Sequence, residues 1–217
     1  MIEVYVRVYG DVTENNIKEK KTTVKYVYQF VQDIINGDMP TDEPVEAITQ
    51  GWINEKGTWF YYNESGVKST GWDKIEHNGN DEWFFFNEAG EMQTGWQSVN
   101  GTWYYMAANG VMLTGWINDN GTWYYTAPNG AMQTGWVFVD GEWYFLAGNG
   151  AMQTGWINDN GTWYYADGNK GTMVRGWKEI VYKGKVEWFF FYENGSMASN
   201  TVVDGWSIDS NGVATQL

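Results

Sequence analysis

The chain has 217 residues, a length typical of one domain or two, and it combines 15 Trp, 15 Tyr, 10 Phe and 27 Gly with one His and no Cys. Acidic residues outnumber basic ones by 27 to 13, and the resulting net charge of -14 argues against a basic groove that binds nucleic acid. The lack of cysteine excludes disulfides and thiolate sites, a single histidine makes a His-ligated zinc centre or a Ser-His-Asp triad hard to build, and no apolar run is long enough to cross a bilayer.

Residues 1–45 differ from the rest of the chain and predict a small α+β segment of unassigned role. Apolar residues at positions 2, 4, 6 and 8 indicate a strand, and the apolar pattern of residues 22–35 favours a helix. The second stretch also alternates at 24, 26, 28 and 30, so a strand remains open there. Met1 is not followed by a basic stretch and an apolar segment, so no signal peptide is predicted.

Residues 46–217 form a tandem array. A Gly-Trp pair recurs with its Trp at positions 52, 72, 96, 116, 136, 156, 177 and 206, most often at intervals of 20 residues. Within a regular unit the sequence is G-W-x4-G-x-W-[YF]-[YF], followed by a Gly-rich step and a Met. This period is too short for a repeat built from two helices.

Each unit is predicted to form a β-hairpin. Pairs such as Asn120-Gly121 lie between two aromatic-rich segments, and Asn-Gly favours the tight primed turns of hairpins. The strand period of two puts Trp123 and Tyr125 on one face and Tyr124 on the other. One hairpin cannot bury such faces alone, whereas stacked neighbours can. We therefore expect an all-β repeat, a solenoid of stacked hairpins.

Three units depart from the pattern. The two tryptophans are 11 residues apart in the units of Trp72 and Trp177, against 7 in the regular units. These units are interpreted as lengthened hairpins, and we expect the altered spacing to disturb a ligand site. The last unit, around Trp206, is interpreted as lacking its second Trp and is expected to cap the stack.

The repeated aromatic residues favour one kind of ligand. Between Gly95 and Asn158 there are three acidic residues and no Lys or Arg, so the rings have no competing cation nearby. A quaternary ammonium is attracted to several ring faces by cation–π interaction. Because it has no hydrogen-bond donor, an aromatic cluster binds it without burying an unpaired polar group.

The motif TGWINDNGTWYY, at residues 114–125 and again at 154–165, resembles the choline-binding repeats of Gram-positive surface proteins and autolysins. The resemblance covers roughly residues 51–204. It implies hairpins stacked into a left-handed solenoid, with each site formed by two Trp of one unit, an aromatic residue of the next and a Met. It further implies a non-catalytic module, extracellular and non-covalently attached to the bacterial cell wall, whose partner is choline-bearing teichoic acid.

The resemblance assigns up to five choline sites to this sequence, of which we expect three or four. The pairs with the family spacing are Trp52 with Trp59, Trp96 with Trp103, Trp116 with Trp123, Trp136 with Trp143, and Trp156 with Trp163. The third rings are expected at Phe85, Tyr125, Phe145, Tyr165 and Phe190, with the neighbouring position left open in each case. The residues expected to close the sites are Met112, Met132, Met152 and Met173.

Each site is expected to bind weakly. A cation–π contact contributes roughly 0.5–2 kcal/mol, so two or three rings give a dissociation constant on the order of millimolar. Several sites on a polymer with many choline groups would then give firm attachment by avidity. No metal or cofactor is expected, and a homodimer is left open.

Other interpretations stay open. The aromatic residues could serve only as core, or the repeats could bind glucan, since similar units occur in glucan-binding domains. The chain could also be the wall-targeting part of an autolysin whose catalytic domain lies elsewhere. Asp119 and Asp159 are interpreted as turn residues, and no facing pair of carboxylates marks a glycosidase cleft, so no enzyme activity is predicted.

Overall fold

The computed structural model describes residues 50–217, and the expectations for residues 1–45 lie outside this range. The described residues form strands and no helix, so none of them provides a helix that could cross a membrane. The strands are β1 (Gly51–Glu55), β2 (Thr58–Tyr62), β3 (Gly71–His77), β4 (Asn80–Phe86), β5 (Gly95–Val99), β6 (Thr102–Met106), β7 (Gly115–Asp119), β8 (Thr122–Thr126), β9 (Gly135–Val139), β10 (Glu142–Leu146), β11 (Gly155–Asp159), β12 (Thr162–Ala166), β13 (Gly176–Tyr182), β14 (Lys185–Phe191), β15 (Thr201–Val203), β16 (Trp206–Ile208) and β17 (Ala214–Gln216).

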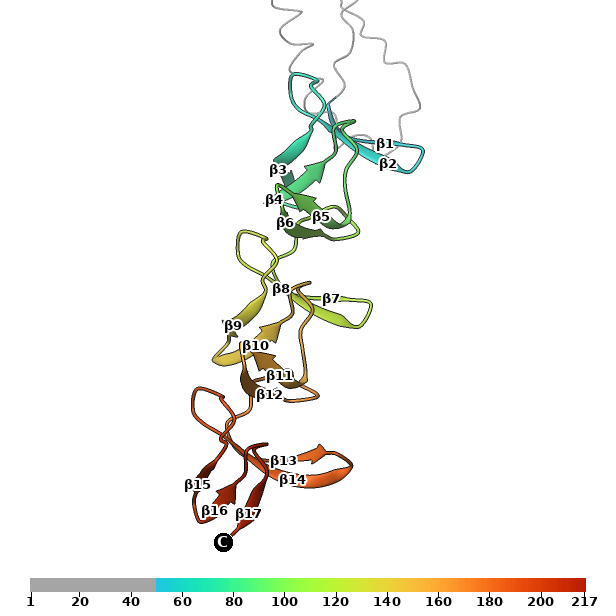
Figure 1. Ribbon diagram of the computed structural model, residues 1–217. Helices are drawn as coiled ribbons and strands as arrows, with labels where there is room; N and C mark the ends of the chain where they lie inside the picture. The colour runs from blue at the N-terminus through green and yellow to red at the C-terminus, as the bar shows by residue number, and fades with distance from the viewer. Residues whose placement is uncertain (1–49) are drawn as a thin grey trace, which may run out of the picture. The chain divides into compact units, whose positions relative to one another are not determined.

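Consecutive strands pair as antiparallel hairpins, as the repeat predicts (Figure 1). In the hairpin of β7 and β8, Trp116 lies opposite Tyr125 and Asn118 lies opposite Trp123. Asn120 and Gly121, at the turn, have φ angles of 50° and 85°. Positive φ at both central residues defines a type I′ turn, whose twist matches that of the strands. The prediction of an all-β array of stacked hairpins is therefore confirmed.

The two long hairpins are extended only at their turns. In the hairpin of β3 and β4, Trp72 lies opposite Phe85 and Lys74 lies opposite Trp83. This is the register of the regular hairpins, because the additional residues lie beyond Lys74 and before Trp83. The ring centroids of Trp72 and Trp83 are 6.3 Å apart, the same distance as those of Trp116 and Trp123. The expected disturbance of this tryptophan pair is thus not found.

The last unit has a different register from the regular hairpins. Trp206 lies on β16, directly after the turn at Asp204-Gly205, and pairs with Val203 as Thr122 pairs with Asp119. Ser207 takes the place of the second Trp of a regular hairpin, so this unit lacks that Trp, as interpreted, and its Gly-Trp pair lies at the turn instead of at the start of the first strand. β15, β16 and β17 join the preceding hairpin in one sheet of order β13-β14-β17-β16-β15. Trp188 pairs with Ala214 where β14 meets β17, which covers this end of the array with strands.

Neighbouring hairpins contact each other through opposite faces. In the hairpin of β7 and β8, Trp116 contacts Tyr144 of the next hairpin, whereas Tyr124 contacts Trp96 of the preceding one. The backbone adds a link, because the amide of Met152 donates to the carbonyl of Trp123, at 2.7 Å. Each hairpin therefore presents its tryptophan face to its successor.

Candidate functional site

The candidate sites are the contacts between successive hairpins, which we call junctions and name by the first tryptophan of the earlier hairpin. At four junctions this tryptophan packs edge-on against a tyrosine of the next hairpin. The ring pairs are Trp72–Tyr104, Trp96–Tyr124, Trp116–Tyr144 and Trp136–Tyr164, with centroids 4.7–4.8 Å apart. We call these the tyrosine junctions.

The second tryptophan of each hairpin at a tyrosine junction is open to solvent. Trp103, Trp123 and Trp143 are exposed by 44, 43 and 37%, and Trp83 by 42%. The ring planes of Trp116 and Trp123 make an angle of 85°, so they form two walls of a corner. The tyrosine of the next hairpin adds a third ring to this corner. Trp72 and Trp83 form the same corner. At the Trp96 and Trp136 junctions, the close ring contact between hairpins is that of the first tryptophan with Tyr124 or Tyr164.

The ring that contacts the preceding hairpin is the neighbour of the one expected for the site. Tyr125, one of the five expected rings, packs on Trp116 of its own hairpin, at 5.1 Å, because the two residues are opposite each other in the sheet. Tyr124, on the other face, reaches Trp96 of the preceding hairpin. The other expected rings, Phe85, Phe145, Tyr165 and Phe190, likewise pack on Trp72, Trp136, Trp156 and Trp177 of their own hairpins.

The Trp52 and Trp156 junctions are filled by phenylalanine. Trp52 contacts Phe84 at 4.8 Å, and Trp156 contacts Phe189 at 4.9 Å. Both phenylalanines are 0% exposed, and each belongs to a cluster with a buried Ile and a second buried Phe. The indole Nε1 atoms of Trp52 and Trp156 are buried without a hydrogen-bond partner. These two junctions are compact apolar contacts, unlike the tyrosine junctions.

The methionines connect three successive units. The amide of Met132 donates to the carbonyl of Trp103, and its sulfur packs against Gly150 in the loop after the next hairpin. The other expected methionines, Met112, Met152 and Met173, donate in the same way to Trp83, Trp123 and Trp143. Met92 and Met197, which were not among the expected residues, donate to Trp59 and Trp163. Their position in the repeat was the signal that could have identified them.

In the first unit a lysine replaces this methionine. Lys68 bridges to Tyr62 as Met132 bridges to Thr126. Its Nζ lies 4.2 Å from the ring centroid of Phe60 and 5.6 Å from that of Tyr62. The array thus holds one of its own ammonium groups over aromatic rings.

Two aspartates interpreted as turn residues have a further role. Asp119 and Asp159 end strands β7 and β11, and each carboxylate accepts a hydrogen bond from an indole of the preceding hairpin. Nε1 of Trp96 donates to Asp119 at 3.2 Å, and Nε1 of Trp136 donates to Asp159 at 3.1 Å. The interpretation as turn residues only was therefore incomplete, because the bond joins residues 23 positions apart.

A tyrosine of one junction is held in its neutral form. Burial, together with the negative charges of Glu142 and Asp140, raises the pKa of Tyr144. The phenol, neutral at pH 7 like any tyrosine, therefore also stays protonated to a higher pH than an ordinary tyrosine.

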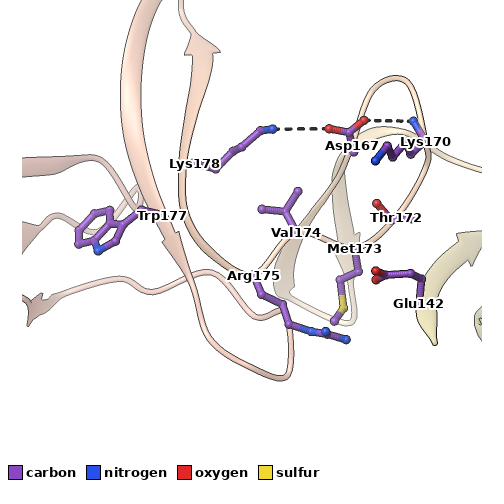
Figure 2. Close-up of a pocket in the computed structure, with 9 residues that line it drawn as sticks. All are labelled: Glu142, Asp167, Lys170, Thr172, Met173, Val174, Arg175, Trp177 and Lys178. Atoms are coloured by element: carbon purple, nitrogen blue, oxygen red, sulfur yellow. Dashed lines mark hydrogen bonds and ion pairs between the residues drawn. The ribbon is translucent and has the colours of Figure 1, made fainter.

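Three basic side chains of the C-terminal units line an open hollow of about 380 Å³ (Figure 2). Its lining includes Lys170, Arg175 and Lys178, and Nζ of Lys178 lies 3.5 Å from the carboxylate of Asp167. The backbone amides of Lys170 and Asn169 donate to that carboxylate and lower the pKa of Asp167. Within residues 50–217, no group of three or more His, Asp or Glu side chains is placed to bind a metal ion.

Comparison with known families identifies the repeats. Residues 69–114, 93–134 and 133–176 match the choline-binding repeat, and residues 50–68 match a cell wall binding repeat. Together these matches extend over residues 50–176, more than half of the chain. No curated protein matches the chain significantly.

Solved structures of similar proteins have the same architecture. Choline binding protein F from Streptococcus pneumoniae is 40% identical, with a TM-score of 0.70 over 77% of this chain and 58% of that chain. CbpJ from the same species is 37% identical, with a TM-score of 0.69 over 77% of this chain and 58% of that chain. The chain thus spans less than two thirds of either relative. The modular autolysin LytC from Streptococcus pneumoniae, at 24% identity and a TM-score of 0.60 over 80% of this chain and 39% of that chain, shares the fold.

Proposed function

Because the chain belongs to the family of choline-binding repeat proteins, we propose that its tyrosine junctions bind the choline groups of cell-wall teichoic acid and attach the protein non-covalently to the bacterial surface. The observation that carries the proposal is the packing of a tryptophan on a tyrosine of the next hairpin beside an exposed second tryptophan, for example Trp116, Tyr144 and Trp123. A trimethylammonium group fits such a corner because it attracts ring faces and needs no hydrogen-bond acceptor.

The charges around the Trp96, Trp116 and Trp136 junctions support a cationic ligand, whereas at the Trp72 junction Lys74 lies opposite Trp83. From Gly95 to Asn169 the sequence contains no Lys or Arg, so no side chain of that stretch competes for the rings. Lys68 supplies an internal example, since its ammonium group lies over Phe60. The ring of Phe60 therefore already makes a cation–π contact with an ammonium group of the same chain.

We assign choline to the four tyrosine junctions and a supporting role to the Trp52 and Trp156 junctions. At the latter, Trp52 with Trp59 and Trp156 with Trp163 keep the near-perpendicular tryptophan pair, but buried Phe84 and Phe189 replace the tyrosine of the next hairpin. Their packed phenylalanine clusters fit the supporting role better than a ligand site. The methionines at the tyrosine junctions would border the ligand.

Attachment would come from several weak sites acting together. Two or three rings give a dissociation constant on the order of millimolar for free choline. A wall polymer that carries many choline groups engages several junctions of one array, and each further contact then forms at a high effective concentration. The protein would remain on the wall and be released by excess free choline.

The test is a choline titration followed by tryptophan fluorescence and near-ultraviolet circular dichroism. We expect a saturable change at millimolar choline, and none with ammonium chloride or with 3,3-dimethylbutanol, the neutral analogue. Trp123→Ala should remove part of the signal change and weaken retention on choline-bearing resin. Val202→Ala, an exposed position on β15, should leave both unchanged. Absence of any saturable change with choline would overturn the proposal, and retention on dextran would then favour glucan binding.

A further inference from the structure

The junctions differ in the residue that lies at the indole edge of the first tryptophan. At the Trp96 and Trp136 junctions it is a carboxylate, since Nε1 donates to Asp119 or Asp159. At the Trp116 junction, between these two, Val139 takes the equivalent place at the end of β9. At the Trp72 junction the equivalent residue is Val99, at the end of β5. Two tyrosine junctions therefore carry a fixed negative charge and two do not.

We propose that Asp119 and Asp159 are specificity-determining residues, which make the Trp96 and Trp136 junctions higher-affinity sites that select cations, alternating with weaker, uncharged sites. This inference rests on the proposed function of the tyrosine junctions and deepens it. The array would then present two classes of site to one polymer.

Both carboxylates are held in place. One oxygen of Asp119 accepts from Trp96, and the other accepts from the side chain of Asn120 at 2.9 Å. Asp159 is held in the same way by Trp136 and by Asn160, at 2.8 Å. A charge that is already oriented needs no rearrangement when the ligand binds, so its full attraction is available to the ligand.

No cation of the described chain neutralises these charges. The ion pairs among residues 50–217 are Lys74–Asp81 and Lys178–Asp167, and neither involves Asp119 or Asp159. A quaternary ammonium over the Trp96 ring would lie within several ångströms of the Asp119 carboxylate. At such a separation and an intermediate dielectric constant, the attraction strengthens binding by about three- to tenfold. In 1 M salt, where the Debye length is about 3 Å, the effect should vanish.

The test measures choline affinity at each junction separately. In ¹⁵N-labelled protein the indole N–H signals of Trp96, Trp116 and Trp136, assigned with Trp→Phe variants, are followed during titration with choline and with 3,3-dimethylbutanol at low and high salt. In low salt, the dissociation constants for choline at Trp96 and Trp136 should be about three- to tenfold below that at Trp116. The variant Asp119→Asn keeps an oxygen that accepts from the indole and removes only the charge. It should weaken choline binding at Trp96 alone and leave 3,3-dimethylbutanol unaffected.

A gain of charge provides the reverse test. Val139→Asp places a carboxylate at the equivalent position of the Trp116 junction and should raise the affinity for choline there to that of Trp96. Glu88→Gln, which removes a charge from an exposed loop, is the matched control and should change no junction.

Three results would contradict the inference, and they are distinguishable. Equal choline affinity at all tyrosine junctions, unchanged by Asp119→Asn, would overturn the role of the aspartates and leave the proposed function intact. If Asp119→Asn weakened the binding of choline and of 3,3-dimethylbutanol equally, the role of the aspartates in selecting cations would also be overturned. Asp119 would then only hold the Trp96 ring in place. A lack of response to choline at every indole would overturn both.

Discussion

Substitution of Phe189 by Ala examines whether the Trp156 junction is a close-packed contact that supports the array. Phe189 is 0% exposed, and its ring lies 4.9 Å from that of Trp156 and 5.6 Å from that of Tyr182. Removal of a fully buried phenylalanine ring costs about 3–5 kcal/mol, as the sum of lost apolar burial and the remaining cavity. Each edge contact with another aromatic ring adds about 0.5–1.5 kcal/mol, so we expect a value in the upper half of that range.

The assay is urea unfolding followed by far-ultraviolet circular dichroism and tryptophan fluorescence. Phe84→Ala removes the equivalent ring of the Trp52 junction, and the two variants should lose comparable stability. The matched control is Val181→Ala in the same hairpin as Phe189, since Val181 is 71% exposed and should change stability by less than about 0.5 kcal/mol. A loss below about 1 kcal/mol for Phe189→Ala would refute the reasoning, because it would show that this junction is not tightly packed.

Two further predictions concern the loops. Gly150 has a φ of +84°, and a Cβ there would lie 2.4 Å from the sulfur of Met132, whereas a Cβ at Gly161, with a φ of +86°, meets nothing within 4 Å. Both Gly→Ala variants should lose stability through backbone strain, but thermal unfolding should show an additional loss of about 1–3 kcal/mol for Gly150→Ala. Equal losses, or a difference that persists when Met132 is also changed to Ala, would contradict this. The second prediction concerns Asp167, whose pKa is lowered from 3.8 by donation from two backbone amides, so its contribution to stability is fully present above 3.8 and is lost as the pH falls from there through the lowered pKa of the folded state. In acid unfolding curves, the stability advantage of the native chain over Asp167→Asn should shrink below this pH, and an advantage independent of pH would exclude the ionised carboxylate as its source.

The sequence by itself determined the local structure of the array. Turn pairs such as Asn120-Gly121 and the alternation of Trp123, Tyr124 and Tyr125 depend on adjacent residues, so the hairpins, the faces of their strands and the repeat period could be predicted. The lack of cations from Gly95 to Asn169, and with it the preference for a cationic ligand, also comes from the sequence.

The contacts between hairpins were decided by the tertiary structure. Alternation places Tyr124 and Tyr125 on opposite faces, but only the stacking shows that the next hairpin turns its Tyr144 face, not its Phe145 face, toward Trp116. The same holds for the bond from Trp96 to Asp119, because its donor and acceptor belong to different hairpins. Turn chemistry and strand alternation act between neighbours in the chain, whereas packing joins residues of successive units, and their relative orientation is set by the stack as a whole.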